Sequence, residues 1–288
     1  MNNSIKILTS IFNDLKKYSG NNFIIQCTGS ILQDNDLLRS FAEDIVALQN
    51  SGINIIVIHD GSNVVNQMMD KFTLKGATDN IRVTDQVTAE IVEMILSGHV
   101  NKKIVSQINQ ASGYAAGISG KDSQFLLAKR ATIARHDFGL NDSAMNFGFL
   151  GDLSLINPDI LFLFEDQDII PIISPIALGE DGKTYKLDPS DISGAIAAIL
   201  GAKKLFFISD DPGILDTENE TLYEINPDQA NKILSKEKEN SPLASNIRAG
   251  LMALENNSEE IHIIDGRIPH CLLRELFTDE LVGTTIKA

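Results

Sequence analysis

The sequence predicts an α/β protein, a three-layer αβα sandwich with a central, mostly parallel sheet arranged in two lobes. Apolar runs at 23–27 and 53–58 are typical of buried strands, and residues 36–48 between them carry apolar side chains at helical spacing. Strand, helix and strand in this order favour parallel strands with helices on both faces. Ligands bind such sheets at the carboxyl ends of the strands. The predicted site therefore comprises residues 28–30, 59–63 and 117–121.

A first helix is predicted over residues 4–18, where apolar side chains recur three and four positions apart and Gly20 follows. This helix either folds back on its own domain or binds a partner. A later helix is predicted to begin after Thr84, a good capping residue, and to end at Gly98. The segment 125–156 predicts hairpins at the edge of the sheet.

The run 169–178 predicts one continuous central strand, although Pro171 and Pro175 must then fall at its ends or at irregularities. The glycine-bounded polar segment 179–182 that follows is the predicted boundary between the lobes. Beyond it, residues 205–209 predict another buried strand. The predicted domains are an N-terminal helix within residues 1–20, a first lobe at 21–178 and a second lobe at 179–288.

Composition excludes several classes of partner. The chain has 288 residues, 43% of them hydrophobic, which is enough for a substantial core. Its net charge of −15 repels nucleic acid and anionic membranes. Cys27 and Cys271 belong to no metal or redox spacing and predict buried free thiols in a reducing compartment, and the histidines form no metal-binding motif. We expect a cytoplasmic protein without a metal site, nucleic-acid partner or membrane segment.

Arg82 immediately precedes the helix predicted to begin after Thr84. An arginine at that place can bind a carboxylate through two hydrogen bonds while the free amides of the helix end add donors, which suits a small acidic ligand. A solvated surface arginine is the alternative. Farther along, residues 115–122 predict a short strand and a turn of small residues, but their spacing matches neither a P-loop nor a dinucleotide-binding fingerprint.

The segment 82–109, together with the sequence GISGKD at 117–122, resembles the acetylglutamate kinases of the amino acid kinase family, and the resemblance extends over nearly the whole chain. It implies phosphorylation of N-acetyl-L-glutamate by MgATP in arginine biosynthesis. It also implies that residues 21–178 hold the amino-acid substrate and residues 179–288 the nucleotide. The helix within residues 1–20 would join dimers into a hexamer.

The resemblance assigns roles to individual positions. A first group would bind the substrate and its carboxylate: Gly61, Ser62, Arg82, Lys186 and Asp188. A second group, at two strand exits, would bind the nucleotide: Thr28, Gly29, Ser209, Asp210 and Gly213. Near the C-terminus, His270 and Glu280 occupy positions that surround the arginine effector in sensitive members, although Leu281 could block that pocket.

Four catalytic motifs depart from the kinase pattern. The two catalytic lysines of the family align with Gln26 and Asn246, and the aspartate that orients them aligns with Ser190, with a one-residue slip to Asp191 left open. Asp60 stands in the glycine-rich loop that would face the phosphates. Phosphoryl transfer depends on positioned cations, because several negative charges meet in its transition state.

Three functions are compatible with these departures. The first is a degenerate acetylglutamate kinase homologue, a pseudokinase retained as a ligand-binding or regulatory subunit, which could assist an active kinase. The second is a working kinase for N-acetylglutamate or a related acidic amino acid, with Lys186, or secondly Lys121, as a relocated cation. The third is a scaffold subunit without ligands. The expected ligands are a small acidic amino acid, MgATP and arginine, none bound tightly, in a homo-oligomer that is a dimer or a hexamer.

Overall fold

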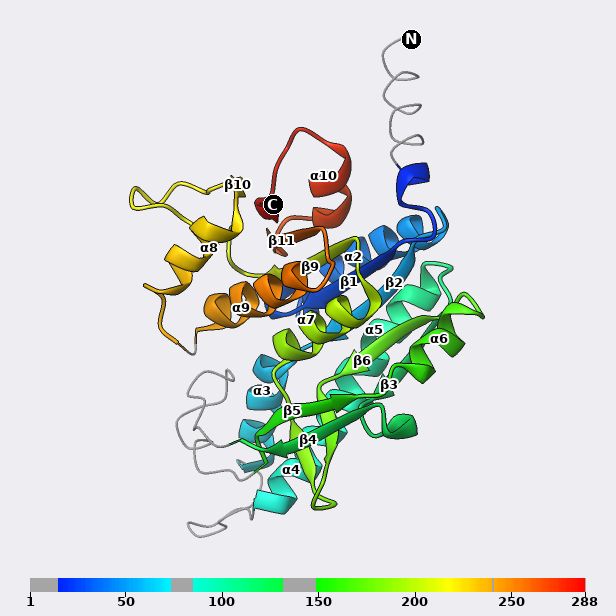
Figure 1. Cartoon of the computed structure of the whole chain (residues 1–288). Helices are drawn as coiled ribbons and strands as arrows, with labels where there is room; N and C mark the ends of the chain where they lie inside the picture. The colour runs from blue at the N-terminus through cyan, green and yellow to red at the C-terminus, as the bar shows by residue number, and fades with distance from the viewer. Residues whose placement is uncertain (1–14, 74–84, 132–148, 240, 288) are drawn as a thin grey trace.

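The computed structural model describes residues 15–73, 85–131, 149–239 and 241–287 (Figure 1). Their centre is an eight-stranded sheet with the strand order β10-β12-β11-β9-β1-β2-β6-β3. The strands from β11 to β3 in this order are parallel, and β12 runs antiparallel to β11. The strand bounds are Asn22–Cys27 (β1), Asn54–His59 (β2), Ala115–Ser119 (β3), Ile170–Ser174 (β6), Lys204–Ser209 (β9), Glu224–Ile225 (β10), Glu260–Asp265 (β11) and Gly283–Lys287 (β12).

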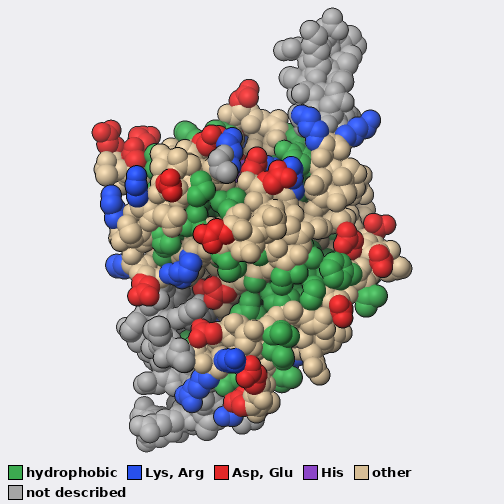
Figure 2. All heavy atoms as spheres, in the orientation of Figure 1, with side chains coloured by type: hydrophobic (Ala, Val, Ile, Leu, Met, Phe, Trp, Pro, Cys, Tyr) green, Lys and Arg blue, Asp and Glu red, His purple; other side chains and the backbone are tan. Residues whose placement is uncertain are grey.

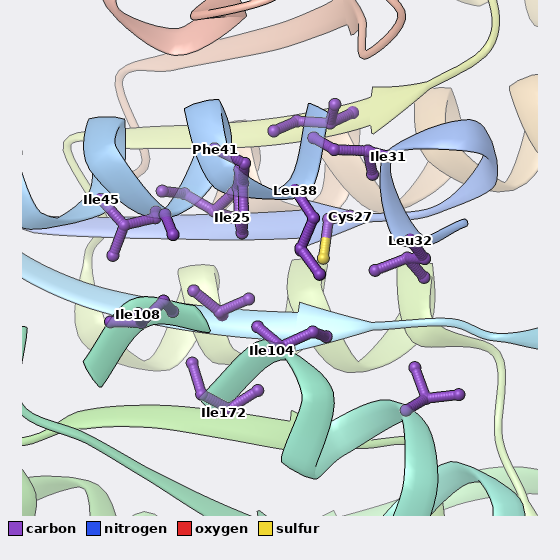
Figure 3. Packing of buried hydrophobic residues seen from close by; sticks show 14 of the residues in the cluster. Ile25, Cys27, Ile31, Leu32, Leu38, Phe41, Ile45, Ile104, Ile108 and Ile172 are labelled. Carbon is purple, nitrogen blue, oxygen red and sulfur yellow. The ribbon is translucent and has the colours of Figure 1, made fainter. Parts of the chain in front are cut away.

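Helices cover both faces of this sheet, which confirms the predicted three-layer sandwich. Phe23 and Ile25 of β1 belong to the core cluster on the α2 and α5 face, whereas Ile24 belongs to the cluster on the α7 and α9 face. Figure 3 shows the first of these clusters. That face carries η1 (Gly29–Leu32), α2 (Asn35–Gln49), α3 (Ser62–Thr73), α5 (Asn101–Gln110) and α10 (Cys271–Phe277), and the other carries α6 (Asp159–Glu165), α7 (Pro189–Leu200), α8 (Pro227–Leu234) and α9 (Pro242–Glu255).

A second sheet of four strands has the order β5-β4-β7-β8. The hairpin predicted within 125–156 corresponds to the antiparallel pair β4 and β5, but this pair belongs to the second sheet and not to the edge of the central one. The continuous strand predicted at 169–178 is wrong. Pro175, which has no amide hydrogen to donate, separates β6 from β7, and the two strands lie in different sheets. The bounds are Leu126–Arg130 (β4), Gly151–Ile156 (β5), Ile176–Gly179 (β7) and Thr184–Lys186 (β8).

The helix predicted to end at Gly98 continues past it. α4 (Asp85–Glu93) passes into the π-helical η2 (Met94–Val100), and η2 passes directly into α5. Glycine ends a helix where the backbone turns left-handed, as Gly201 does after α7 with a φ of 56°. Gly98 does not take a positive φ, and so it lies inside the helix instead of ending it.

Two other segment predictions meet the structure only in part. Of the helix predicted over residues 4–18, residues 15–18 are described; they are helical, and Leu15 and Tyr18 pack against the core. Residues 179–182 form the turn between β7 and β8, and the lobe boundary predicted there stays a prediction. Within the described ranges, no helix has both the length and the apolar character needed to cross a bilayer. Both cysteines are buried free thiols, as predicted.

The contact between α7 and α9 is close at Gly194. A methyl group at Gly194 would lie 2.7 Å from the carbonyl oxygen of Ala249, whereas a methyl group at Gly98 would meet nothing within 4 Å. We expect Gly194→Ala to lower the free energy of unfolding by about 1–2 kcal/mol, because overpacking outweighs the better helix propensity of alanine. Gly98→Ala is the matched control and should be neutral or stabilising by up to about 1 kcal/mol. Urea unfolding of both variants checks this, and equal effects would contradict it.

Candidate functional site

A cleft of about 250 Å³ opens at the carboxyl edge of the central sheet. Its walls come from the exits of β1, β2 and β9 and from the amino-terminal ends of α3, α7 and α9. This is the edge at which the sequence predicted a ligand site. The polar lining residues are Gln26, Thr28, Gln33, Asp60, Ser62, Asn63, Lys186, Asp188, Ser190, Ser209, Asp210, Asp211, Ser245, Asn246 and Arg248.

Two proline-started helices point their first turns at the cleft. α7 begins with Asp188 as its cap and Pro189 at its first position, and α9 begins in the same way with Ser241 and Pro242. Proline suits this place because the first helical amide has no partner within the helix. Both helices start at the same edge of the sheet, and the first turn of α7 and the second turn of α9 lie beside β1.

The alternation of side chains along β1 turns Gln26 toward α7 and α9. There Gln26 Nε2 donates to Ser190 Oγ at 3.3 Å and to Asn246 Oδ1 at 3.4 Å, and Ser190 Oγ donates to the same Asn246 oxygen at 2.8 Å. Each of the three side chains is only 3% exposed. The side chains of Gln26, Ser190 and Asn246 thus form a neutral hydrogen-bonded network.

One hydrogen-bond acceptor of this network has no donor among the described residues. Gln26 Oε1 is buried and has no hydrogen-bond partner in the described part of the chain. A buried polar atom without a partner costs free energy, typically about 1–3 kcal/mol. Such an atom is found at sites that a ligand or water completes.

Lys186 and Asp60 form an ion pair in the cleft, with Lys186 Nζ 3.3 Å from Asp60 Oδ1. Lys186 is only 1% exposed. Burial by itself would raise the pKa of Asp60, but Lys186 and the hydrogen bonds from Ser62 outweigh burial and hold this pKa below its ordinary value. Lys186, predicted as a possible relocated cation, is therefore paired with the carboxylate of Asp60.

The neighbouring His59 adds no charge to the cleft. Burial lowers the pKa of His59 to about 4, so its imidazole is neutral near pH 7. Its Nδ1 lies 2.8 Å from the carbonyl oxygen of Asp60, and its Nε2 lies 3.2 Å from Asn101 Nδ2. The imidazole thus donates from Nδ1 and accepts at Nε2, which braces the loop that carries Asp60.

The helix starts around the cleft are already capped by side chains of this chain. Asp188 accepts the Ser190 amide at 2.9 Å, Ser241 accepts the Ala244 amide at 3.1 Å, and Asp60 accepts the Ser62 amide at 3.2 Å. Free amides at helix starts are the usual donors to phosphate. Here those amides are partly occupied, and two of the three caps are carboxylates.

The loop after β1 is fastened to the exit of β9. Asp210 Oδ1 accepts the Ser30 amide at 2.8 Å, and Thr28 donates to the Ile208 carbonyl from its amide at 2.9 Å. Gly29 has a φ of 73°, and a methyl group there would lie 2.7 Å from the Asp210 carboxylate. Glycine is required at this position both for the backbone conformation and for the approach of Asp210.

Several residues that line the cleft were missed from the sequence. Asp211 and Arg248 adjoin predicted residues, but nothing in their spacing distinguishes them from surface charges. The lining contains four carboxylates, of Asp60, Asp188, Asp210 and Asp211, against the two cations of Lys186 and Arg248. Within the described residues, no group of three or more potential metal-ligating side chains converges on one point.

Other predicted residues lie elsewhere. The turn at 117–121 does not line the cleft, because β3 is two strands away from β2 in the sheet. Its Lys121 pairs with Glu93 at 2.6 Å and is not available in the cleft as a replacement cation. Gly213 is also outside the cleft and packs against Thr284. Arg82 lies outside the described residues.

The two predicted effector residues each have a partner within the chain. His270 is the N-cap residue that precedes α10 and has a φ of 57°, and its Nδ1 lies 2.7 Å from Asp44 Oδ1 on α2. Glu280 pairs with Arg274, and the neighbouring Leu281 is exposed. Arginine binding there stays a prediction.

Fold and cleft together define an α/β protein that would hold its ligand where parallel strands end and helices begin. A model of the amino acid kinase family matches residues 21–265, and the chain therefore belongs to the amino acid kinase family. The acetylglutamate kinases of Rhodospirillum rubrum and Ehrlichia canis are 35% and 37% identical to it; the alignments cover 98% and 99% of this chain and 92% and 89% of those proteins.

The fold is also found in a solved structure of low sequence identity. The N-acetylglutamate synthase of Neisseria gonorrhoeae, complexed with coenzyme A and N-acetyl-glutamate, superimposes with a TM-score of 0.80 at 20% identity. The match covers 99% of this chain and 63% of the synthase chain. This likeness concerns the fold alone.

The buried Asp44 should make stability depend on pH. Burial raises the pKa of Asp44 to about 6 from an ordinary value of 3.8, although His270 opposes the rise. The folded state therefore holds this proton more tightly than the unfolded chain. The resulting stability is full below about pH 4 and is lost as the pH rises through about 6, by up to about 3 kcal/mol. Asp44→Asn should remove this loss.

The measurement is urea unfolding of the wild type and the variant at pH 5 and pH 7.5. We expect Asp44→Asn to gain stability relative to the wild type at the higher pH. Glu218→Gln, at an exposed position, is the control and should leave the pH dependence unchanged. Identical pH profiles for the wild type and Asp44→Asn would refute the expectation.

Proposed function

We propose that this chain is a ligand-binding acetylglutamate kinase homologue with little or no phosphoryl transfer. The observation that carries the proposal is the neutral contact of Gln26, Ser190 and Asn246, at the positions where the resemblance places two lysines and an aspartate. Phosphoryl transfer gains its rate from cations aimed at the transferring group. Amides can donate hydrogen bonds to a phosphoryl oxygen but cannot neutralise its charge.

The expected loss is large. Removing one preorganised group that stabilises charge typically costs roughly 100-fold to 1000-fold in turnover, and groups that act together are not additive. Lys186 compensates little, because Asp60 lies 3.3 Å from it. The four carboxylates of the cleft add to the repulsion of a nucleotide triphosphate. Binding of a ligand is thus better supported than turnover.

The proposed ligands follow from the family and from the cleft. A small acidic amino acid such as N-acetylglutamate would lie between the loop at Gly61 and the start of α7, with MgATP a weak ligand near Thr28 and Ser209. Arginine near His270 and a homo-oligomeric, regulatory role beside an active kinase are further parts of the proposal. Calorimetric titration with N-acetylglutamate, arginine and MgATP shows which of these ligands bind. If none of the three binds, a scaffold without ligands is favoured.

Restoring the charged residues should restore turnover. Gln26→Lys with Asn246→Lys should recover activity with N-acetylglutamate and MgATP more than either change alone. Because the two new ammonium groups would face each other without a carboxylate, adding Ser190→Asp should raise turnover further, by about 100-fold or more over the unmodified chain. A coupled assay of ADP release measures this.

The control carries the same added charge elsewhere: Gln49→Lys with Asn231→Lys, both outside the cleft, should stay inactive. Ordinary kinase turnover by the unmodified chain would overturn the proposal.

A second candidate, an active kinase with a relocated cation, is favoured by one observation: Lys186 lines the cleft and is almost wholly buried there. Turnover by the unmodified chain that disappears in Lys186→Ala would establish this candidate in place of the first.

The ion pair also makes a prediction about binding. Asp60→Asn removes a carboxylate from the cleft and releases Lys186 from its partner, so the dissociation constant for MgATP should fall by about tenfold. Glu180→Gln, a surface change at a residue paired with Lys129, is the charge-matched control. Isothermal calorimetry on both variants is the measurement. No tightening, or equal tightening in the control, would show that Asp60 does not restrain Lys186.

A further inference from the structure

A smaller pocket of about 150 Å³ adjoins the cleft. It shares Leu32, Gln33 and Val64 with the cleft and then extends between η1, α3 and the continuous helix formed by η2 and α5. Its polar lining consists of Gln33, Gln67, His99 and Lys103. We refer to it as the Lys103 pocket.

The helix that runs through η2 into α5 provides the basic side of this pocket. His99 and Lys103 are four residues apart and therefore lie on one side of the helix. The neighbouring Ile104 and Ile108 pack toward the sheet, as Figure 3 shows, and this fixes the rotation of α5. The packing of α5 against the core thus fixes the backbone position of Lys103.

Hydrogen bonds hold the lining in place. Lys103 Nζ donates to the Leu32 carbonyl oxygen at 3.0 Å, which ties α5 to η1. Gln67 Nε2 donates to Gln33 Oε1 at 3.1 Å, which ties α3 to the segment after η1. An ammonium group has three donors, and an amide nitrogen has two, so both groups keep donors beyond these bonds.

The charge of the Lys103 pocket contrasts with the rest of the molecule. The chain has a net charge of −15, and acidic side chains are spread over the face seen in Figure 2. The larger cleft has four carboxylates in its lining, whereas no carboxylate is among the described residues that line the Lys103 pocket. The nearby Asp34 already accepts the Asp36 and Leu37 amides at the start of α2. A lysine, a histidine and two amides without a lining acid make a setting for an anion.

We propose that the Lys103 pocket binds a small oxyanion, the carboxylate or phosphate group of a ligand whose remainder lies in the cleft. Three residues line both spaces, so the Lys103 pocket and the cleft are direct neighbours. The volume suits one such group and excludes a nucleoside. This subsite does not depend on phosphoryl transfer, because none of its residues belongs to the neutral network or to the Lys186 ion pair.

The test is calorimetric titration of the full chain with inorganic phosphate and, separately, with glutarate, a plain dicarboxylate. The wild type should bind at least one of these anions at millimolar concentration, and the one bound identifies the chemistry of the ligand. Lys103→Met should weaken that binding by about tenfold or more, since a hydrogen bond to a charged group is lost. Lys102→Met is the matched control, because Lys102 is on the same helix but donates to Asn101 and Gly117 outside the pocket.

The bond from Lys103 to Leu32 means that Lys103→Met could disturb η1 as well. Lys103→Arg keeps the charge and a donor, and it should retain binding within a few-fold of the wild type. Thermal melts of every variant show whether each is folded. The proposal is overturned if neither anion binds the wild type, if Lys102→Met loses binding as Lys103→Met does, or if Lys103→Arg fails to retain binding while folded.

Discussion

The contact of Gln26, Ser190 and Asn246 joins the three elements on which the cleft depends. These side chains connect the end of β1 to the first turn of α7 and the second turn of α9, and all three are buried. α7 and α9 can approach each other there because Gly194 has no side chain opposite Ala249. The hydrogen bonds among the three neutral side chains hold both helices beside the end of β1.

A balance of charge governs what the rest of the cleft can bind. The Lys186 and Asp60 pair cancels locally, and Asp188 and Asp210 are engaged with backbone amides. What remains is a polar, mildly acidic cavity with one buried acceptor, Gln26 Oε1, that has no partner among the residues that the structure describes. The Lys103 pocket beside it has the opposite character. A ligand with separated donor and anionic ends would match both spaces better than a polyphosphate does.

Local patterns in the sequence predicted the central elements well, and the misses have identifiable causes. Buried parallel strands are continuous apolar runs, so β1, β2 and β9 were evident. The run at 169–178 was equally apolar, yet it holds two strands, because both sheets bury the chain on either side of Pro175. A glycine after an apolar helical stretch predicts a helix end at Gly98, but the backbone there stays helical because the surrounding helix is held by packing.

The amino-acid sequence was sufficient to establish the family, the three-layer fold and the edge of the sheet where ligands would lie, since these depend on hydrophobic pattern and strand order. It also identified most of the cleft residues through the resemblance. It could not place 117–121 away from the cleft, because strand order in space is set by long-range pairing. Nor could the sequence predict the ion pair between Lys186 and Asp60 or the pocket beside Lys103. Those features bring together residues far apart in the chain, and packing alone determines their distances.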